Sequence, residues 1–356
     1  MRKMVGILIA MLLFPWLVSL AWSGVAKGDG QEEKQQEEKT QEEKWQVGGS
    51  ADVGAVNAKA ENVKPGSTEA DGTESDGMEP DGTESASAER RVLVEREGIQ
   101  TYISLEDYLP GVIVCQISQQ YRPEALKCQA VIARTYIYRL MEGRSEIREE
   151  ELDLDYLSEN QSNAPWDREK TAQYLEQCRQ AVAETAGVTM QYEGREILPL
   201  FHAVSAGRTR TGDENYPYLQ SVESRWDTER EDYLQTMEWG LSAFAGLINA
   251  IPDAVVVTTE QLPAQLQTVK KDDAGYVMQM KAGAKTYTGE EIQYALGLPS
   301  SCFTLEGDSG AIRAIVKGIG HGYGLSQAGA DAMAGEGWGY QDILNYYYKN
   351  ISLISE

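Results

Sequence analysis

The stretch that decides the fold is residues 123–140, PEALKCQAVIARTYIYRL. Pro123 stands at its start, where proline is favoured because its missing N–H has no intrahelical partner in the first turn. Apolar side chains then recur at intervals of three and four residues, the spacing of one helix face. These residues are Leu126, Ala130, Ala133, Ile137 and Leu140. The stretch therefore predicts a helix with one face packed on a core.

Polar side chains flank this apolar stripe on both sides. Lys127 and Arg134 lie seven residues apart on one flank, and Gln129 and Tyr136 lie on the other. Two cations on one flank either bind an anion or pair with carboxylates on a solvated face. Of the two, Arg134 is the better candidate for binding a carboxylate, because its planar guanidinium matches that group.

The rest of the segment 91–356 alternates between helical and extended patterns. Ser104 followed by two acidic residues is typical of a helix start. The expected helices are 105–115, 170–185, 326–334 and 340–348. The expected strands are 91–97, 99–103, 188–192, 197–203, 254–259, 276–281 and 311–317. This order predicts an α+β fold in one large mixed domain, long enough to bury a sizeable core.

An apolar run opens the chain. Arg2 and Lys3 precede residues 4–22, which carry no charged side chain. Such a run is just long enough to span a bilayer, and it also has the layout of a secretory signal. Residues 1–22 are therefore expected to be either a membrane anchor or a signal peptide cleaved after Ala21. Either one places the remainder outside the cytoplasm, anchored to the membrane or secreted.

Residues 23–90 have the composition of a disordered acidic stalk. The tetrapeptide QEEK begins at residues 31, 36 and 41, and Asp-Gly begins at residues 71, 76 and 81. A period of five suits neither helix nor strand, and so polar a sequence buries too little apolar surface to fold. The net charge of −24 argues against a nucleic-acid partner, because phosphates attract basic surfaces.

The cysteines and histidines permit some further chemistry. Cys115, Cys128, Cys178 and Cys302 lie far apart, and their spacing indicates neither a disulfide pairing nor a metal site. Neither metal nor cofactor is expected. His202, Ser205 and Asp213 provide the side chains of a hydrolase triad, but the Gly-x-Ser-x-Gly motif of that class is absent from the sequence.

Several blocks of residues 91–356 carry a resemblance to a known family. They are 105–112 (LEDYLPGV), 124–136 (EALKCQAVIARTY), 201–209 (FHAVSAGRT), 217–224 (PYLQSVES) and 318–330 (GIGHGYGLSQAGA). In this order they resemble the stage II sporulation protein D and amidase-enhancer family. The resemblance implies a glycan-binding cleft, peptidoglycan strands stripped of stem peptides as the substrate, and a cell-wall amidase as the partner.

The resemblance also implies catalytic chemistry, and at one position this chain departs from it. Sporulation members resemble lytic transglycosylases, which need a protonated carboxylic acid beside the glycosidic oxygen. The family has a glutamate at the position that Gln116 occupies here. An amide cannot act as a general acid, although it can hydrogen-bond to a sugar. The sequence therefore predicts an impaired enzyme.

The resemblance assigns substrate contacts to residues in three blocks. Val204 and Ala206 differ from the threonine and glycine that family members commonly have, so the block at 201–209 has also diverged. The glycines between 318 and 324 are expected to turn the backbone tightly into the following helix, with His321 projecting from the bend. The candidate contacts are Lys127, Gln129, Arg134, Tyr136, Ser205, Arg208, Thr209, His321, Ser326 and Gln327.

Three functions stay open at this point. The first is a catalytically impaired glycan-binding protein that recruits or stimulates an amidase. The second is an active transglycosylase in which another carboxylate replaces the missing acid, and the third is a structural envelope protein. The stand-in acids for the second function are Glu106, Glu124, Asp213 and Glu214.

Overall fold

The computed structural model describes residues 89–96, 98–157 and 168–355, all of which belong to one compact unit. The expected anchor or signal at 1–22 lies outside the described residues, as does almost all of the expected stalk at 23–90. Within the described residues, no helix is both long enough and apolar enough to cross a membrane. The fold is mixed α and β, as the sequence predicts, and it contains two hydrophobic cores.

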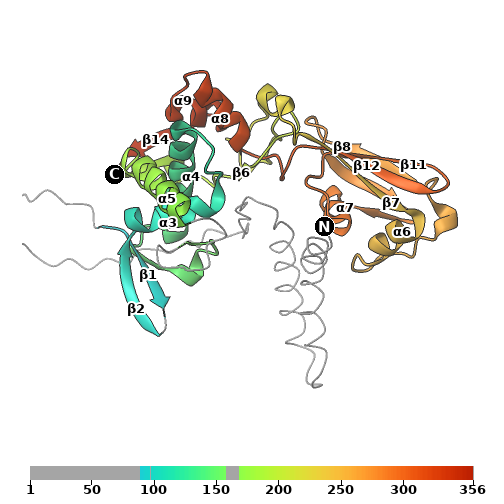
Figure 1. Ribbon diagram of the computed structural model, residues 1–356, viewed down its shortest axis with the longest axis horizontal. Coiled ribbons are helices and arrows are strands. Elements are labelled where there is room, and N and C mark those ends of the chain that lie inside the picture. The colour runs from blue at the N-terminus through green and yellow to red at the C-terminus, as the bar shows by residue number, and fades with distance from the viewer. Residues whose placement is uncertain (1–88, 97, 158–167, 356) are drawn as a thin grey trace, which may run out of the picture. The chain divides into compact units, whose positions relative to one another are not determined.

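The first core surrounds a central helix (Figure 1). Helix α4 contacts α3, α5, α8, α9 and strand β4, so it is buried on nearly all sides, including at Ile132, Arg134 and Thr135. The apolar stripe that the sequence predicts for this helix is therefore narrower than the surface that the helix buries in the structure. The helices are α3 (Leu105–Gln116), α4 (Pro123–Met141), α5 (Arg168–Ala183), α8 (Gln327–Gly335) and α9 (Tyr340–Tyr347).

Local signals place the starts of α3 and α4 where the sequence predicts them. The Ser104 hydroxyl caps α3 by accepting a hydrogen bond from the backbone N–H of Asp107 at 3.1 Å. Pro123 is the first residue of α4, which ends at Met141 and is capped by Glu142 in a left-handed conformation.

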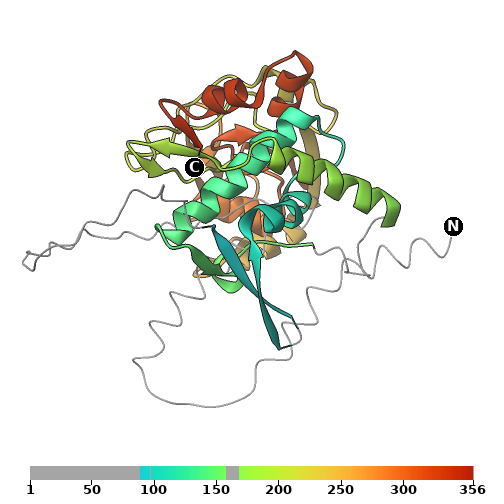
Figure 2. The same ribbon diagram turned by 90° about the vertical axis from the view of Figure 1, so that its left-hand side faces the viewer.

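Three small sheets lie around these helices. Strands β1 and β2 form the predicted hairpin, which extends away from the helices (Figure 2), and β3 pairs with β1 in parallel. A second sheet has the order β14-β4-β5, and β6 pairs with β13 in parallel. The strands are β1 (Arg91–Arg96), β2 (Ile99–Ser104), β3 (Glu146–Arg148), β4 (Val188–Tyr192), β5 (Arg195–Glu196), β6 (Phe201–His202), β13 (Leu325–Ser326) and β14 (Ser352–Ser355).

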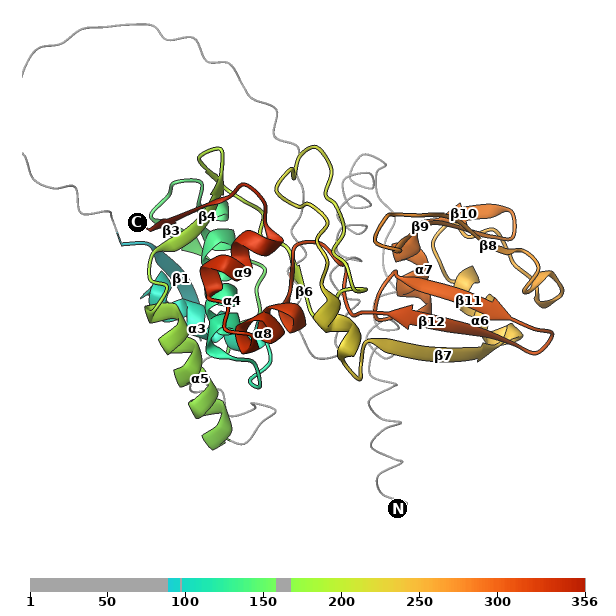
Figure 3. The same cartoon turned by 90° about the horizontal axis from the view of Figure 1, so that it is seen from above.

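The second core is built from two three-stranded antiparallel sheets and two helices (Figure 3). The sheet orders are β11-β12-β7 and β10-β9-β8. Helix α6 contacts β7 and β12, and α7 contacts both α6 and β9. The elements are β7 (Leu234–Gly240), α6 (Leu241–Asn249), β8 (Leu266–Lys271), β9 (Val277–Ala282), β10 (Lys285–Tyr287), α7 (Gly289–Leu296), β11 (Phe303–Gly307) and β12 (Ala311–Lys317).

One predicted strand is wrong, and another is longer than the strand that forms. Residues 254–259 form no strand, although the run of three valines suggests one. Val255 and Val256 are exposed, and the side chain of Asn249 takes both hydrogen bonds of the Val257 backbone, so no strand pairs there. The predicted strand at 197–203 shrinks to Phe201–His202. The sequence patterns also miss several elements of the second core, namely β7, α6, β8, β10, α7 and β11.

Candidate glycan site

Three glutamine side chains from separate parts of the sequence meet between α3, α4 and α8. Gln116 is the last residue of α3, Gln129 lies in the second turn of α4, and Gln327 is the first residue of α8. All three are buried, and Gln116, at 3% exposure, is the most accessible of them. The structure thus brings Gln116, the residue at the predicted position of the family acid, together with two of the predicted contact residues.

A chain of hydrogen bonds links the glutamine cluster, with Gln327 and Gln129 as donors and Gln129 and Gln116 as acceptors. Gln327 donates from Nε2 to the Gln129 side-chain oxygen at 3.1 Å and to the Gln116 carbonyl at 2.8 Å. Gln129 in turn donates from Nε2 to the Gln116 side-chain oxygen at 2.9 Å. The Gln327 Oε1 atom is buried and has no partner among the described residues. The site therefore offers uncharged amide groups and an unused acceptor.

The glycines of the 318–324 stretch bring Gln327 to this place. Gly318, Gly320, Gly322 and Gly324 all have positive φ, which confirms the predicted tight turn. At Gly324 a Cβ atom would lie 1.8 Å from the Leu200 carbonyl oxygen, so only glycine fits there. Ser326 then caps α8 by accepting a hydrogen bond from the Gly329 N–H.

A buried carboxylate that the sequence analysis misses lies beside the cluster. Asp227 is fully buried and accepts hydrogen bonds from the Ser326 hydroxyl at 2.9 Å and the Ser205 backbone N–H at 2.8 Å. Burial raises the pKa of Asp227 above its ordinary value, against the opposing effect of these hydrogen bonds. Asp227 holds two predicted contact residues in place, but its carboxylate is not open to a ligand. No motif in the sequence marks it.

The predicted cations on α4 are both engaged within the protein. Arg134 is fully buried, and its guanidinium makes two hydrogen bonds of 2.7 Å to the Glu106 carboxylate. Lys127 forms ion pairs with Glu124 and Glu184, each at 2.6 Å. These contacts favour a structural role for both residues, and glycan binding by them stays a prediction.

Three other predicted contacts are bonded to residues outside the glutamine cluster. The Tyr136 hydroxyl donates to the Leu152 carbonyl at 3.4 Å. Thr209 is buried, and its hydroxyl accepts a hydrogen bond from the Val222 N–H at 2.9 Å. Arg208 is exposed, and its guanidinium contacts the Ser221 hydroxyl at 3.4 Å.

The two histidines lie side by side, with His202 buried and His321 partly buried. Their ring centroids are 5.8 Å apart. His202 binds the Tyr323 carbonyl through Nδ1, and His321 accepts from the Tyr323 N–H, while both Nε2 atoms are buried without a partner in the described part of the chain. Burial lowers the pKa of His202 to about 3 and that of His321 to about 4. Both rings are therefore neutral at physiological pH.

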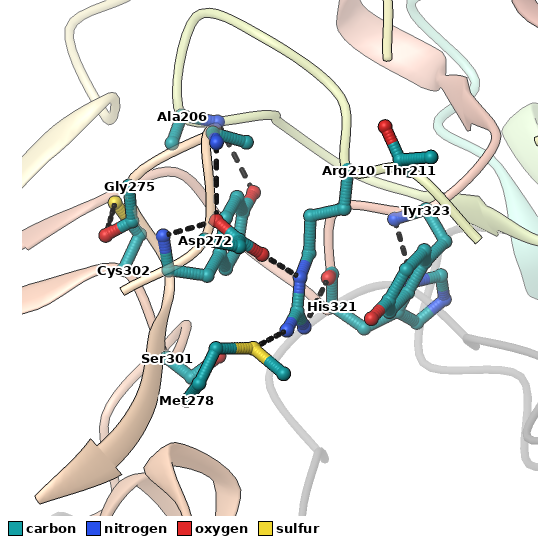
Figure 4. A network of polar contacts seen from close by, with 12 residues as sticks. Ala206, Arg210, Thr211, Asp272, Gly275, Met278, Ser301, Cys302, His321 and Tyr323 are labelled. Carbon is teal, nitrogen blue, oxygen red and sulfur yellow. Dashed lines mark hydrogen bonds and ion pairs between the residues drawn. The ribbon is translucent and has the colours of Figure 1, made fainter. Parts of the chain in front are cut away.

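The loop that carries Arg208 is tied to the second core through Arg210 (Figure 4). The buried Arg210 guanidinium pairs with Asp272 at 2.6 Å and with Glu290 at 3.1 Å. It also lies over the rings of Tyr276 and Tyr323. Sequence patterns do not single out Arg210, because its carboxylate partners are 62 and 80 residues away.

The stand-in acids are occupied or displaced from the cluster. Glu106 is bound by Arg134, and Glu124 accepts hydrogen bonds from Lys127 and from the Tyr340 backbone N–H. Asp213 accepts from the Asn215 N–H in a local turn. Among the described residues, neither Asp213 nor Glu214 hydrogen-bonds to Gln116. His202, Ser205 and Asp213 do not assemble as a triad either, because His202 and Ser205 are bonded to other partners.

All four cysteines are free thiols in this structure. Over the described ranges, no three His, Cys, Asp or Glu side chains are grouped as they would be to hold a metal ion.

Comparisons with known proteins bear on this site. The family model described as Stage II sporulation protein matches residues 95–192, which include Gln116 and all of α4. Stage II sporulation protein D of Bacillus amyloliquefaciens is 33% identical over 266 residues, which cover 70% of this chain and 74% of that protein. This chain belongs to the stage II sporulation protein D family. The Bacillus subtilis protein of the same name is 30% identical over the same shares of both chains.

A second kind of relative is also similar to this member of the family. The amidase enhancer of Bacillus subtilis is 24% identical over 298 residues, which cover 69% of this chain and 40% of the enhancer.

Proposed function

We propose that this protein remodels the cell wall during sporulation by binding stripped peptidoglycan strands and stimulating a wall amidase, without cutting glycan itself. The observation that carries the proposal is the Gln116 amide in the glutamine cluster. Gln116 accepts a hydrogen bond from Gln129, which leaves its own amide N–H groups as donors. These donors suit the oxygens of a sugar.

The absence of an acid at this position argues against cleavage. Protonation of the leaving oxygen by a positioned acid is worth about a hundredfold to ten-thousandfold in rate. Within the described residues, the buried carboxylate beside the cluster is Asp227, and both of its oxygens already accept hydrogen bonds.

The amidase part of the proposal draws on the relatives. One relative is named an amidase enhancer, and the similarity to it covers 69% of this chain. We place the protein outside the cytoplasm, where the wall polymer lies. External protease on protoplasts is then expected to release the folded part by cutting within residues 24–88, and its protection from protease would contradict this location.

The test uses the full chain with amidase-stripped glycan strands. Co-sedimentation with the strands is expected, with no 1,6-anhydro-muramyl product. The rate of the purified amidase on intact wall is expected to rise when the protein is added. Anhydro product from the unaltered chain would favour the active transglycosylase. If the protein neither binds strands nor stimulates the amidase, the structural envelope function is the one that remains.

A further inference from the structure

Aromatic side chains gather on the surface formed by the 3-10 helix η2 (Arg225–Glu229) and helix α9. The ring of Tyr346 lies at the centre. The ring centroid of Trp226 is 6.2 Å away and that of Trp338 is 5.9 Å away, both nearly perpendicular to it. All three residues are only partly buried, so they combine packing against the first core with a surface open to solvent.

Three cations surround these rings. The Lys349 ammonium lies 5.0 Å from the Tyr346 ring centroid, and the Arg225 guanidinium lies 5.3 Å from that of Trp226. Arg208 pairs through a backbone bridge with Glu223, whose carbonyl accepts a hydrogen bond from the Tyr346 hydroxyl at 2.7 Å. We call Trp226, Trp338 and Tyr346, together with Arg208, Arg225 and Lys349, the Tyr346 cluster.

The charges of the cluster are only partly balanced. Arg225 lies 3.7 Å from Glu336, which also accepts a hydrogen bond from the Trp226 indole at 2.7 Å. In the part of the chain that the structure describes, Lys349 and Arg208 have no carboxylate within ion-pair distance. Glu223 lies across the backbone bridge from Arg208, so the carboxylates of the cluster are those of Glu223 and Glu336, against three cations. This local excess of cations occurs on a chain in which acidic residues outnumber basic ones by 56 to 32.

The chemistry of the cluster fits a carbohydrate that carries negative charge. Trp, Tyr and Arg are the side chains that most often dominate binding surfaces. Aromatic faces present an apolar surface to the C–H groups of a sugar ring, while their polar ends are wet. The Glu336 carboxylate can accept from sugar hydroxyls, and the free cations can bind a carboxylate.

We propose that the Tyr346 cluster is a second carbohydrate-binding surface, which takes sugar rings bearing carboxylate groups. The proposal rests on the proposed function for the source of such rings, the muramic acid units of a stripped strand. The chain connects the two sites directly, because Trp226 in η2 is followed by Asp227, which bonds to Ser326 next to Gln327. A strand bound at the cluster is thereby held near the glutamine cluster.

The test measures binding of two soluble probes by the full chain. One probe is a tetrasaccharide of alternating N-acetylglucosamine and N-acetylmuramic acid with free lactyl carboxylates, and the other is neutral chitotetraose. The combined Arg208→Gln and Lys349→Gln changes are expected to raise the Kd for the muramyl probe about tenfold. The same changes are expected to leave the Kd for chitotetraose unaltered, because that probe has no carboxylate.

Two further variants keep the result interpretable. The double change Lys270→Gln and Lys281→Gln removes the same charge from exposed positions on strands β8 and β9. It is expected to change neither Kd. Trp338→Ala is expected to weaken both probes about fivefold through the lost aromatic surface. The charge variant alters only side chains at the surface, so it tests the proposal even if Trp338→Ala does not fold.

The outcomes separate this inference from the proposed function. Binding of the muramyl probe with equal Kd in the unaltered and charge variants overturns the Tyr346 cluster alone. Failure of the unaltered chain to bind either probe or stripped strands overturns both. If the charge variant binds both probes more weakly by the same factor, the proposal is also overturned, because the cations then do not recognise the carboxylate.

Discussion

The side-chain amide of Gln129 donates a hydrogen bond of 2.9 Å to the side-chain oxygen of Gln116. The two residues are 13 positions apart, one at the end of α3 and the other inside α4. Because the Oε1 atom of Gln116 accepts this hydrogen bond, its Nε2 amide group is the one left to contact a ligand. Four predictions concern this site and the network of buried charges around it.

Gln116→Glu is expected to give the protein glycan-cleaving activity. Glutamate has nearly the size of glutamine, and one of its oxygens can accept the same hydrogen bond from Gln129. The other oxygen can then carry the proton, and burial favours the protonated form. Anhydro product from stripped strands, measured by chromatography and mass spectrometry, is expected to rise at least about a hundredfold over the unaltered chain.

Two controls accompany this change. Gln116→Ala is expected to yield no product, which excludes a contaminating enzyme. Gln116→Glu combined with Gln129→Leu is expected to lose most of the gain, since the carboxyl is no longer oriented. If Gln116→Glu folds and binds strands but makes no product, the proposed equivalence of residue 116 to the family acid is wrong.

Glu106→Gln is expected to destabilise the first core. The change leaves the fully buried guanidinium of Arg134 without its charged partner. The Glu106 side chain is 40% exposed, so solvent screens the pair and the expected loss is about 2 kcal/mol, less than for a fully buried pair. The free energy of unfolding in urea measures this loss. Glu238→Gln is the matched control, because its pair with Arg313 is exposed and is worth at most about 1 kcal/mol. Equal stability of the two variants would contradict the structural role of Arg134.

The stability of the protein is expected to fall as the pH drops from about 6.5 to about 4. Burial lowers the folded-state pKa of His202 to about 3 and of His321 to about 4, below the ordinary value of 6.5. The unfolded chain therefore binds protons in this window that the folded chain does not. Each histidine contributes a loss of up to about 1.4 kcal/mol per pH unit.

Calorimetry checks this prediction through the protons taken up on unfolding. At pH 5.5 the two histidines are expected to account for nearly two protons, and His321→Asn is expected to reduce the uptake by nearly one. An uptake that the histidine change leaves unaltered would show that His321 is protonated in the folded state.

Arg210→Lys is expected to lower the free energy of unfolding by about 2 kcal/mol. A lysine ammonium cannot satisfy Asp272 and Glu290 together while lying between two aromatic rings. Urea denaturation measures the change, and limited proteolysis is expected to cut the 203–224 loop faster. Arg313→Lys, at an exposed pair, is the control. Unchanged stability and proteolysis in Arg210→Lys would exclude Arg210 as the link between this loop and the second core.

Local sequence signals predicted part of the fold and of the site. Ser104 and Pro123 fix where α3 and α4 begin, because capping and proline geometry act within a single turn. The glycines from 318 to 324 required a tight turn, and the structure has one. The second core was largely missed, since its exposed strand β8 has no apolar alternation and the Val255–Val256 pair imitates a strand.

The sequence by itself determined the α+β class and the family, and it has Gln116 at the position where the family resemblance implies a glutamate. Each of these depends on residue identity and order along the chain. The tertiary structure alone decided that Arg134 is buried against Glu106 and that Gln327 meets Gln116 across 211 residues. Helical periodicity indicates one buried face, whereas α4 is enclosed by helices from both ends of the domain. This enclosure determines which polar groups face a ligand. Because it is made by contacts between residues far apart in the sequence, no local sequence pattern predicts it.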